Sequence, residues 1–98
     1  MLYSIIAEDS ENSLEKRKSV RPEHLKRLEE LKQQGKLVLA GPFPAIDNVD
    51  PGPHGFTGSL IVAEFDNLEQ ATTWANNDPY KKSGAFVNVV VKPFKQVF

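Results

Sequence analysis

The stretch Arg21–Phe43 reads RPEHLKRLEELKQQGKLVLAGPF, a charged helical pattern followed directly by an apolar strand pattern. Leu25, Leu28 and Leu31 recur at helical spacing and define one apolar face. At about 100° per residue, His24 lies only about 40° from the centre of that face. A titratable ring is therefore predicted among leucines that pack on a core.

The helix of this stretch is predicted to begin at Pro22 and to end at Gly35, because proline suits the first helical position and glycine suits the end. A separate charged helical stretch, capped by Asn12 or Ser13, precedes it. We expect Arg21-Pro22 to interrupt the two, since the residue before a proline is pushed out of the helical conformation.

The remaining apolar runs predict three more strands and a second helix. Together with the strand after Gly35, the predicted strands cover Leu2–Ala7, Lys36–Phe43, Ser59–Phe65 and Ala85–Val97. Asn67 caps a helix over Leu68–Asn77, and Asp78-Pro79 ends it. The resulting β-α-β-β-α-β order is that of the ferredoxin-like fold, an α+β class with a four-stranded antiparallel sheet. One domain is expected over residues 1–98.

The predicted strands are apolar on both faces. Leu37 and Leu39 alternate with Val38 and Ala40, a pattern typical of strands that are buried on both sides. In a ferredoxin-like fold both helices cover one face of the sheet, so the other face needs a cover. We expect a second copy to cover it, sheet against sheet, in a homodimer, with further pairing left open. The alternative is that a small domain leaves some valine and alanine exposed.

Composition excludes several classes of partner. The chain carries 12 basic and 13 acidic side chains, a net charge of −1, which argues against non-specific binding to nucleic acid or to a membrane surface. It has no cysteine, and therefore no disulfide, no thiolate nucleophile and no cysteine metal site. No segment has the length of a membrane span or the pattern of a signal peptide, so a cytoplasmic protein is expected.

Topology gathers the unusual residues at one edge of the predicted sheet. The first helix starts and the second helix ends at this edge, which also holds Gly41-Pro42, Gly58-Ser59 and the long loop 44–58. His24, in the opening turn of one helix, is therefore expected beside Asp78, in the closing turn of the other. A carboxylate at a helix C-terminus opposes the macrodipole, and an imidazole would offset it. A His–Asp pair also fixes one ring tautomer and raises the basicity of the free nitrogen.

Other residues at this edge are candidates for holding a ligand. Arg21 contacts an anionic ligand in one interpretation and is a solvated helix-start residue in the other. The predicted substrate-binding set comprises Ser59 and the backbone at Gly41 and Pro42 as hydrogen-bonding groups, and Phe43 or Tyr80 as an apolar wall. The basic run at Lys16, Arg17 and Lys18 is interpreted as a solvated helix face.

The loop 44–58 (PAIDNVDPGPHGFTG, from Pro44) carries the second histidine of the chain. His54 has Asp47 and Asp50 nearby, but this spacing does not fix two histidine ligands on one element, so no metal site and no cofactor are predicted. A solvent-exposed loop histidine is the preferred interpretation. The loop is also a candidate lid over the edge where His24 and Asp78 meet.

Arg21-x-x-His24-Leu25, Gly35, Gly41-Pro42, Gly58-Ser59 and Asp78-Pro79 together resemble the pattern of the YciI-like family, and the likeness covers essentially the whole chain. The resemblance implies a ferredoxin-like dimeric α/β barrel related in fold to muconolactone isomerase. It also implies an active site built on a His–Asp pair at His24 and Asp78. Some relatives act on hydroxylated or chlorinated aromatic rings by elimination or isomerisation, whereas most have no established substrate.

Two functions of different classes are consistent with these features. The first is a cofactor-free enzyme that acts on a small anionic or phenolic molecule, with His24 as general acid or base and Asp78 as its orienting partner. The second is a non-catalytic metabolite-binding or regulatory module that uses the same pocket. Acyl transfer by Ser59 is disfavoured, since no G-x-S-x-G nucleophile elbow is present. RNA binding is disfavoured because the third strand lacks the basic and aromatic pattern of RNA-binding sheets.

Overall fold

A computed structural model describes all residues, 1–98, and confirms the predicted order of strands and long helices. The elements in chain order are β1 (Leu2–Asp9), α1 (Leu14–Gln33), β2 (Leu37–Pro44), the short 3-10 helix η1 (Gly52–His54), β3 (Phe56–Glu64), α2 (Leu68–Asn76), the one-turn helix α3 (Pro79–Lys82) and β4 (Phe86–Phe94). No helix is both long and apolar enough to span a bilayer.

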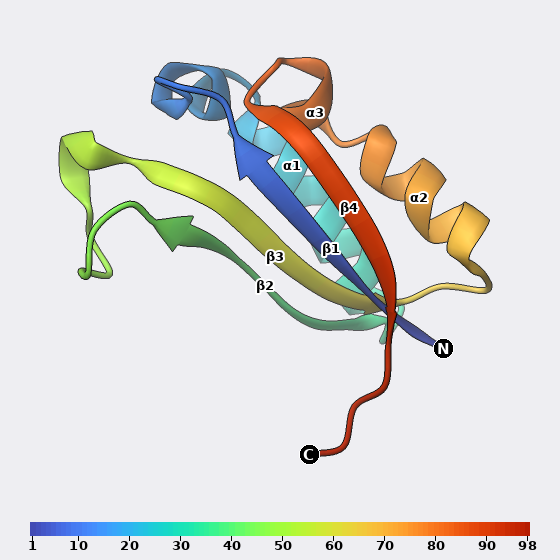
Figure 1. The fold of residues 1–98 in the computed structure, drawn as a ribbon. Coiled ribbons are helices and arrows are strands. Elements are labelled where there is room, and N and C mark those ends of the chain that lie inside the picture. Colours follow the sequence, from blue (N-terminus) through green and yellow to red (C-terminus); the bar gives the residue numbers. More distant parts are fainter.

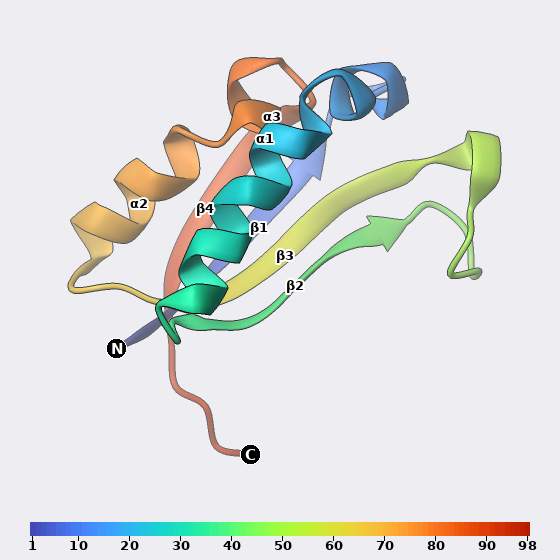
Figure 2. The same ribbon diagram turned by 180° about the vertical axis from the view of Figure 1, so that it is seen from behind.

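The four strands form one antiparallel sheet in the order β2-β3-β1-β4, which is the ferredoxin-like arrangement. Both long helices lie on the same side of this sheet: in Figure 1 the strands lie in front of α1, and Figure 2 shows α1 from the helical side. Ser59 of β3 pairs with Ala7 of β1 on one side and with Pro42 of β2 on the other. This register brings the ends of three strands together.

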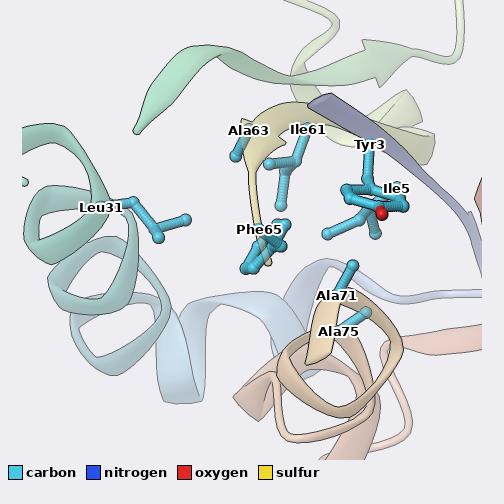
Figure 3. Packing of buried hydrophobic residues seen from close by; sticks show 8 residues of the cluster. All are labelled: Tyr3, Ile5, Leu31, Ile61, Ala63, Phe65, Ala71 and Ala75. Carbon is cyan, nitrogen blue, oxygen red and sulfur yellow. The ribbon is translucent and has the colours of Figure 1, made fainter. Parts of the chain in front are cut away.

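The main core lies between the sheet and the two long helices. Its eight buried residues are Tyr3, Ile5, Leu31, Ile61, Ala63, Phe65, Ala71 and Ala75 (Figure 3). A second buried cluster, made by Ala7, Tyr80, Ala85 and Phe86, lies at the α3 end of the sheet. Of the predicted leucine face, Leu31 is buried and Leu28 packs partly buried against the core, whereas Leu25 is exposed.

Helix α1 corrects the predicted break at Pro22. It runs without interruption from Leu14 to Gln33 with the proline inside it. Its buried residues are Arg17, His24 and Leu31, at seven-residue intervals along one face. Two of these are polar and have buried acceptors on either side of the proline, so tertiary contacts hold the helical path despite the lost backbone hydrogen bond. The helix ends as predicted, with Gly35 in the left-handed region at φ 73°.

Strand β2 continues through Gly41-Pro42 to Pro44, one residue beyond the predicted end at Phe43. Gly41, Pro42 and Phe43 pair with Leu60, Ser59 and Gly58 of β3 in register. Because β2 is an edge strand, a proline that cannot donate on its outer side does not break the sheet.

Strand β3 in turn begins at Phe56 rather than Ser59. The connection between β2 and β3 is therefore shorter than expected, and it contains η1.

The sheet face opposite the helices carries an apolar row across its strands. Leu60, Ile6 and Val90 are directly paired, and Ile6 and Val90 are 40% and 38% exposed. This agrees with the two-sided apolar pattern of the sequence. The second copy expected to cover this face stays a prediction.

Candidate active site

His24 and Asp78 meet in the structure, as the topology predicts. The Nδ1 atom of His24 lies 2.8 Å from Oδ1 and 3.0 Å from Oδ2 of Asp78, and both side chains are buried. Because a carboxylate only accepts, Nδ1 carries the hydrogen and Nε2 is left for another partner. The pair spans 54 residues of sequence and joins the middle of α1 to the start of α3.

The local setting of Asp78 differs from the prediction. Helix α2 ends at Asn76, and Asp78 is the N-cap of α3, where its Oδ1 accepts from the backbone N–H of Tyr80 at 2.9 Å. Pro79 explains both features, since it forces extended backbone at Asp78 and suits the first position of a new helix. The predicted conflict with the α2 macrodipole is therefore wrong.

The ring of Tyr80 packs face to face with the imidazole of His24. The two ring centroids are 3.9 Å apart, and the ring planes are 10° from parallel. Phe86 meets the same tyrosine edge-on, with centroids 5.4 Å apart. The imidazole is thus fixed in position by the carboxylate at one nitrogen and by an aromatic ring on one face.

Arg27 is a further neighbour of Asp78 that the sequence did not indicate. Its Nη1 lies 3.8 Å from Asp78 Oδ2, and its Nη2 donates to the carbonyl oxygen of Trp74 at 2.7 Å. The guanidinium lies 4.2 Å from the Trp74 ring centroid. Burial lowers the pKa of Arg27, and the charges of Asp78 and Glu30 oppose this shift. Trp74 is partly buried and packs against the main core.

Arg17 is buried, and the prediction of a solvated side chain was wrong. Its Nε and Nη2 donate to the two carboxylate oxygens of Asp9 at 2.7 and 2.8 Å. Nη2 also donates to the carbonyl oxygen of Gly58 and to Ser59 Oγ, each at 3.0 Å. The guanidinium lies 5.0 Å from the Tyr80 ring centroid. A bidentate carboxylate and a neighbouring ring replace the water that the charge loses.

The other two residues of the basic run, Lys16 and Lys18, are exposed as predicted. The position of Arg17 in the sequence could have indicated that its side chain is buried. Arg17 lies seven residues before His24, on the same face of a continuous helix. The predicted break at Pro22 concealed this relation.

A cavity of about 460 Å³ lies beside this cluster, between α1 and the strands β2 and β3. Its lining residues are Leu14, Arg17, Lys18, Arg21, His24, Leu25, Leu28, Ala40, Gly41, Pro42, Phe56, Ser59, Ile61 and Tyr80. Three of them are cationic at neutral pH and none is acidic. The cavity therefore favours ligands with negative charge.

Most of the predicted site residues line this cavity; Asp78, which lies behind His24, and Phe43 do not. His24, Arg21, Gly41, Pro42, Ser59 and Tyr80 all line it. Phe43 does not line it: this side chain is 39% exposed and lies over Gly58. His54 is exposed in η1. No group of three or more histidine, cysteine, aspartate and glutamate side chains is arranged to hold a metal ion.

Comparison with known proteins identifies the family. The model of the YCII-related domain matches residues 1–95. The chain belongs to the YCII-related domain family. Protein YciI of Escherichia coli is 57% identical over 98 residues, with the whole of both chains covered. An uncharacterized protein of Haemophilus influenzae is 51% identical over the same length, again with both chains covered in full.

A solved structure with the same fold is that of an enzyme. It is the 5-chloro-2-hydroxyhydroquinone dehydrochlorinase TftG from Burkholderia phenoliruptrix, in complex with 2,5-dihydroxybenzoquinone. The TM-score is 0.84 and the identity is 29%, over 97% of this chain and 94% of that chain. The fold of this chain is therefore related to that of an enzyme that acts on a phenolic compound.

Proposed function

We propose that this protein is a small-molecule enzyme in which His24 transfers a proton and Asp78 orients and charge-stabilises its ring. The proposed reaction is an elimination or an isomerisation of a small phenolic or otherwise anionic compound held in the 460 Å³ cavity. The observation that carries the proposal is the His24 imidazole, whose Nδ1 is held by Asp78 while Nε2 has no protein partner at the cavity wall.

The buried carboxylate supports general acid–base chemistry at Nε2. When Nε2 takes a proton, the imidazolium charge lies 2.8 Å from Asp78 Oδ1, in surroundings where water does not screen the attraction. A proton-transferring group that is positioned in this way contributes about 10²–10⁴-fold to the rate.

The lining of the cavity supports an anionic or phenolic substrate. Arg21 and Lys18 are exposed cations at the cavity, and no carboxylate lines it. The apolar side chains of Leu28 and Ile61 offer packing for a flat ring. This combination favours an aromatic ring that carries ionisable hydroxyl groups.

The related dehydrochlorinase supports elimination as the reaction type. Loss of hydrogen chloride from a chlorinated hydroxyhydroquinone requires that a base take a proton while chloride leaves with the bonding electron pair. In this chain His24 Nε2 would accept the proton from one ring hydroxyl and deliver it to the chlorine-bearing carbon, which gives a keto tautomer. Loss of the proton of a second hydroxyl to solvent would then let chloride leave with the electron pair of the C–Cl bond and give the quinone. Arg21 would attract the phenolate that forms.

Chloride release from 5-chloro-2-hydroxyhydroquinone tests the proposal. We expect wild-type protein to release one chloride per molecule consumed. His24→Ala should lower kcat by about 10²–10⁴-fold with an unchanged circular dichroism spectrum. His54→Ala is the matched control, because His54 is the other histidine and lies away from the cavity. Equal chloride release by His24→Ala and wild type would contradict the role of His24.

A titration with 2,5-dihydroxybenzoquinone, followed by its absorbance, provides a binding readout that does not depend on turnover. Binding of the quinone, combined with return of the chlorinated compound unchanged, would favour the metabolite-binding module over the enzyme. Binding together with chloride release that depends on His24 would support the enzyme.

A further inference from the structure

Tyr80 carries a hydroxyl group that the fold leaves without an acceptor. The residue is 3% exposed; its backbone N–H donates to Asp78 Oδ1 and its carbonyl oxygen accepts from Ser83 Oγ. The phenol ring lines the cavity together with His24. A hydroxyl on a cavity wall that has no acceptor within the chain can donate its proton to a ligand atom.

The surroundings keep the proton on this hydroxyl. Burial raises the pKa of Tyr80, and this shift outweighs the opposing effects of the positive charges of Arg17 and Arg21 and of a hydrogen bond from the Arg17 side chain. At neutral pH the side chain is therefore an uncharged phenol that can donate. The same two guanidinium groups favour an oxygen with negative charge as the acceptor.

Arg17 can act on the Tyr80 hydroxyl only as a donor, so the proton of the phenol stays available to a ligand. The charge of Arg17 is balanced by Asp9, and its Nε and Nη2 already donate within the chain. It therefore stays fixed beside Tyr80, with its guanidinium 5.0 Å from the phenol ring centroid. Because the His24 and Tyr80 rings are parallel at 3.9 Å, one ligand can touch the edges of both.

We propose that the Tyr80 hydroxyl is a second catalytic group, which donates a hydrogen bond to a phenolate or quinone oxygen of the ligand while His24 takes the proton. This rests on the proposed function and narrows its substrate class to rings that carry at least two oxygens. No bond to Tyr80 forms or breaks: its proton stays on its own oxygen and stabilises the charge that develops on the ligand oxygen.

Tyr80→Phe tests the hydroxyl alone. Phenylalanine keeps the ring that stacks on His24 and packs against Phe86, so near-ultraviolet circular dichroism should report an intact site. We expect kcat for chloride release to fall by about 10²–10³-fold, the effect of removing one donor to a developing oxyanion. Affinity for 2,5-dihydroxybenzoquinone should fall by about 10–100-fold, since a hydrogen bond to a charged acceptor is lost.

Tyr3→Phe is the matched control. Tyr3 is buried to a similar degree but lies in the main core (Figure 3), and it does not line the cavity. We expect this variant to keep wild-type turnover and quinone affinity. A Tyr3→Phe variant that loses both as strongly as Tyr80→Phe would overturn the assignment to Tyr80.

The two assays separate failure of this inference from failure of the proposed function. If His24→Ala loses turnover while Tyr80→Phe retains both turnover and quinone affinity, the role of Tyr80 is overturned and the enzyme stands. If wild type releases no chloride but Tyr80→Phe binds the quinone about 10–100-fold more weakly, Tyr80 is a ligand donor and only the enzyme fails. Absence of quinone binding to wild type overturns the inference.

Discussion

Gly58→Ala is expected to destabilise the protein more than any other substitution of glycine by alanine in its sheet. Gly58 of β3 pairs with Glu8 of β1, and a methyl group on its Cα would overlap the carbonyl oxygen of Ala7. The same methyl would lie 3.1 Å from Phe43 Cδ2. Rotation of a side chain cannot relieve an overlap with backbone, so β1 and β3 must separate where the cavity begins.

The expected magnitude follows from the contacts at this point. Forcing extra atoms into a packed site costs about 1–3 kcal/mol. The shift also moves the Gly58 carbonyl and the Ser59 hydroxyl, both of which accept from Arg17 Nη2 at 3.0 Å. A hydrogen bond from a charged donor contributes about 1.5–3 kcal/mol, so loss of one of the two gives a total of about 2.5–6 kcal/mol. This is a large part of the roughly 5–15 kcal/mol that stabilises a domain of this kind.

Urea unfolding followed by circular dichroism measures the effect, and two other glycines provide graded controls. At Gly41 an added methyl group would have no heavy atom within 4 Å, and Gly41→Ala should change the free energy of unfolding by less than about 0.5 kcal/mol. Gly35 is equally open but has φ 73°, so Gly35→Ala should cost about 1–2 kcal/mol. A Gly58→Ala protein as stable as Gly41→Ala would refute the reasoning.

Two further predictions concern Asp78 and Tyr80. Asp78→Asn should lower the free energy of unfolding by about 1.5–3 kcal/mol, because the bond from His24 loses its charged acceptor. Asp78→Ala should lower it by about 1 kcal/mol more, since only alanine also loses the N-cap bond; equal urea midpoints would argue against this division. In Tyr3→Phe the only remaining phenol is Tyr80, and burial raises its pKa, so its ultraviolet titration should lie above the usual value of about 10. Because the pKa of Tyr80 is raised by folding, its uncharged phenol stabilises the folded state below about pH 10, and this stabilisation is lost as the pH rises further. Tyr80→Phe should remove this loss of stability at high pH. Titration of Tyr80 at or below about pH 10 would contradict the prediction.

The order of elements was predictable because apolar runs and glycine and proline stops define strands and helices locally. The pairing of His24 with Asp78 was predictable for a different reason. The ferredoxin-like topology packs both long helices on one face of the sheet and brings the segment after α2 back to α1, although His24 lies in the middle of α1 and not in its opening turn as predicted. The distance of 2.8 Å between His24 Nδ1 and Asp78 Oδ1 confirms the predicted pairing.

The environment of Arg17 was not predictable once Pro22 was assigned as a helix start. A local rule on proline divided α1 in two, and the seven-residue relation between Arg17 and His24 disappeared with it. The rule failed because buried partners on both sides of the proline outweigh one lost hydrogen bond. The role of Arg27 was also not predictable from the sequence, because its contacts with Asp78 and Trp74 depend on how α2 packs against α1.

The continuous helix α1 explains why the cavity has cations in its lining beside the buried His24–Asp78 pair. Asp9 lies behind Arg17, and Asp78 lies behind His24, so each buried carboxylate faces a partner on α1 and neither lines the cavity. The charge that remains open to a ligand comes chiefly from the exposed Arg21 and Lys18, whose attraction salt screens. Charge therefore brings an anionic ring to the cavity. The buried edges of His24 and Tyr80, which salt screens far less, determine what happens to it there.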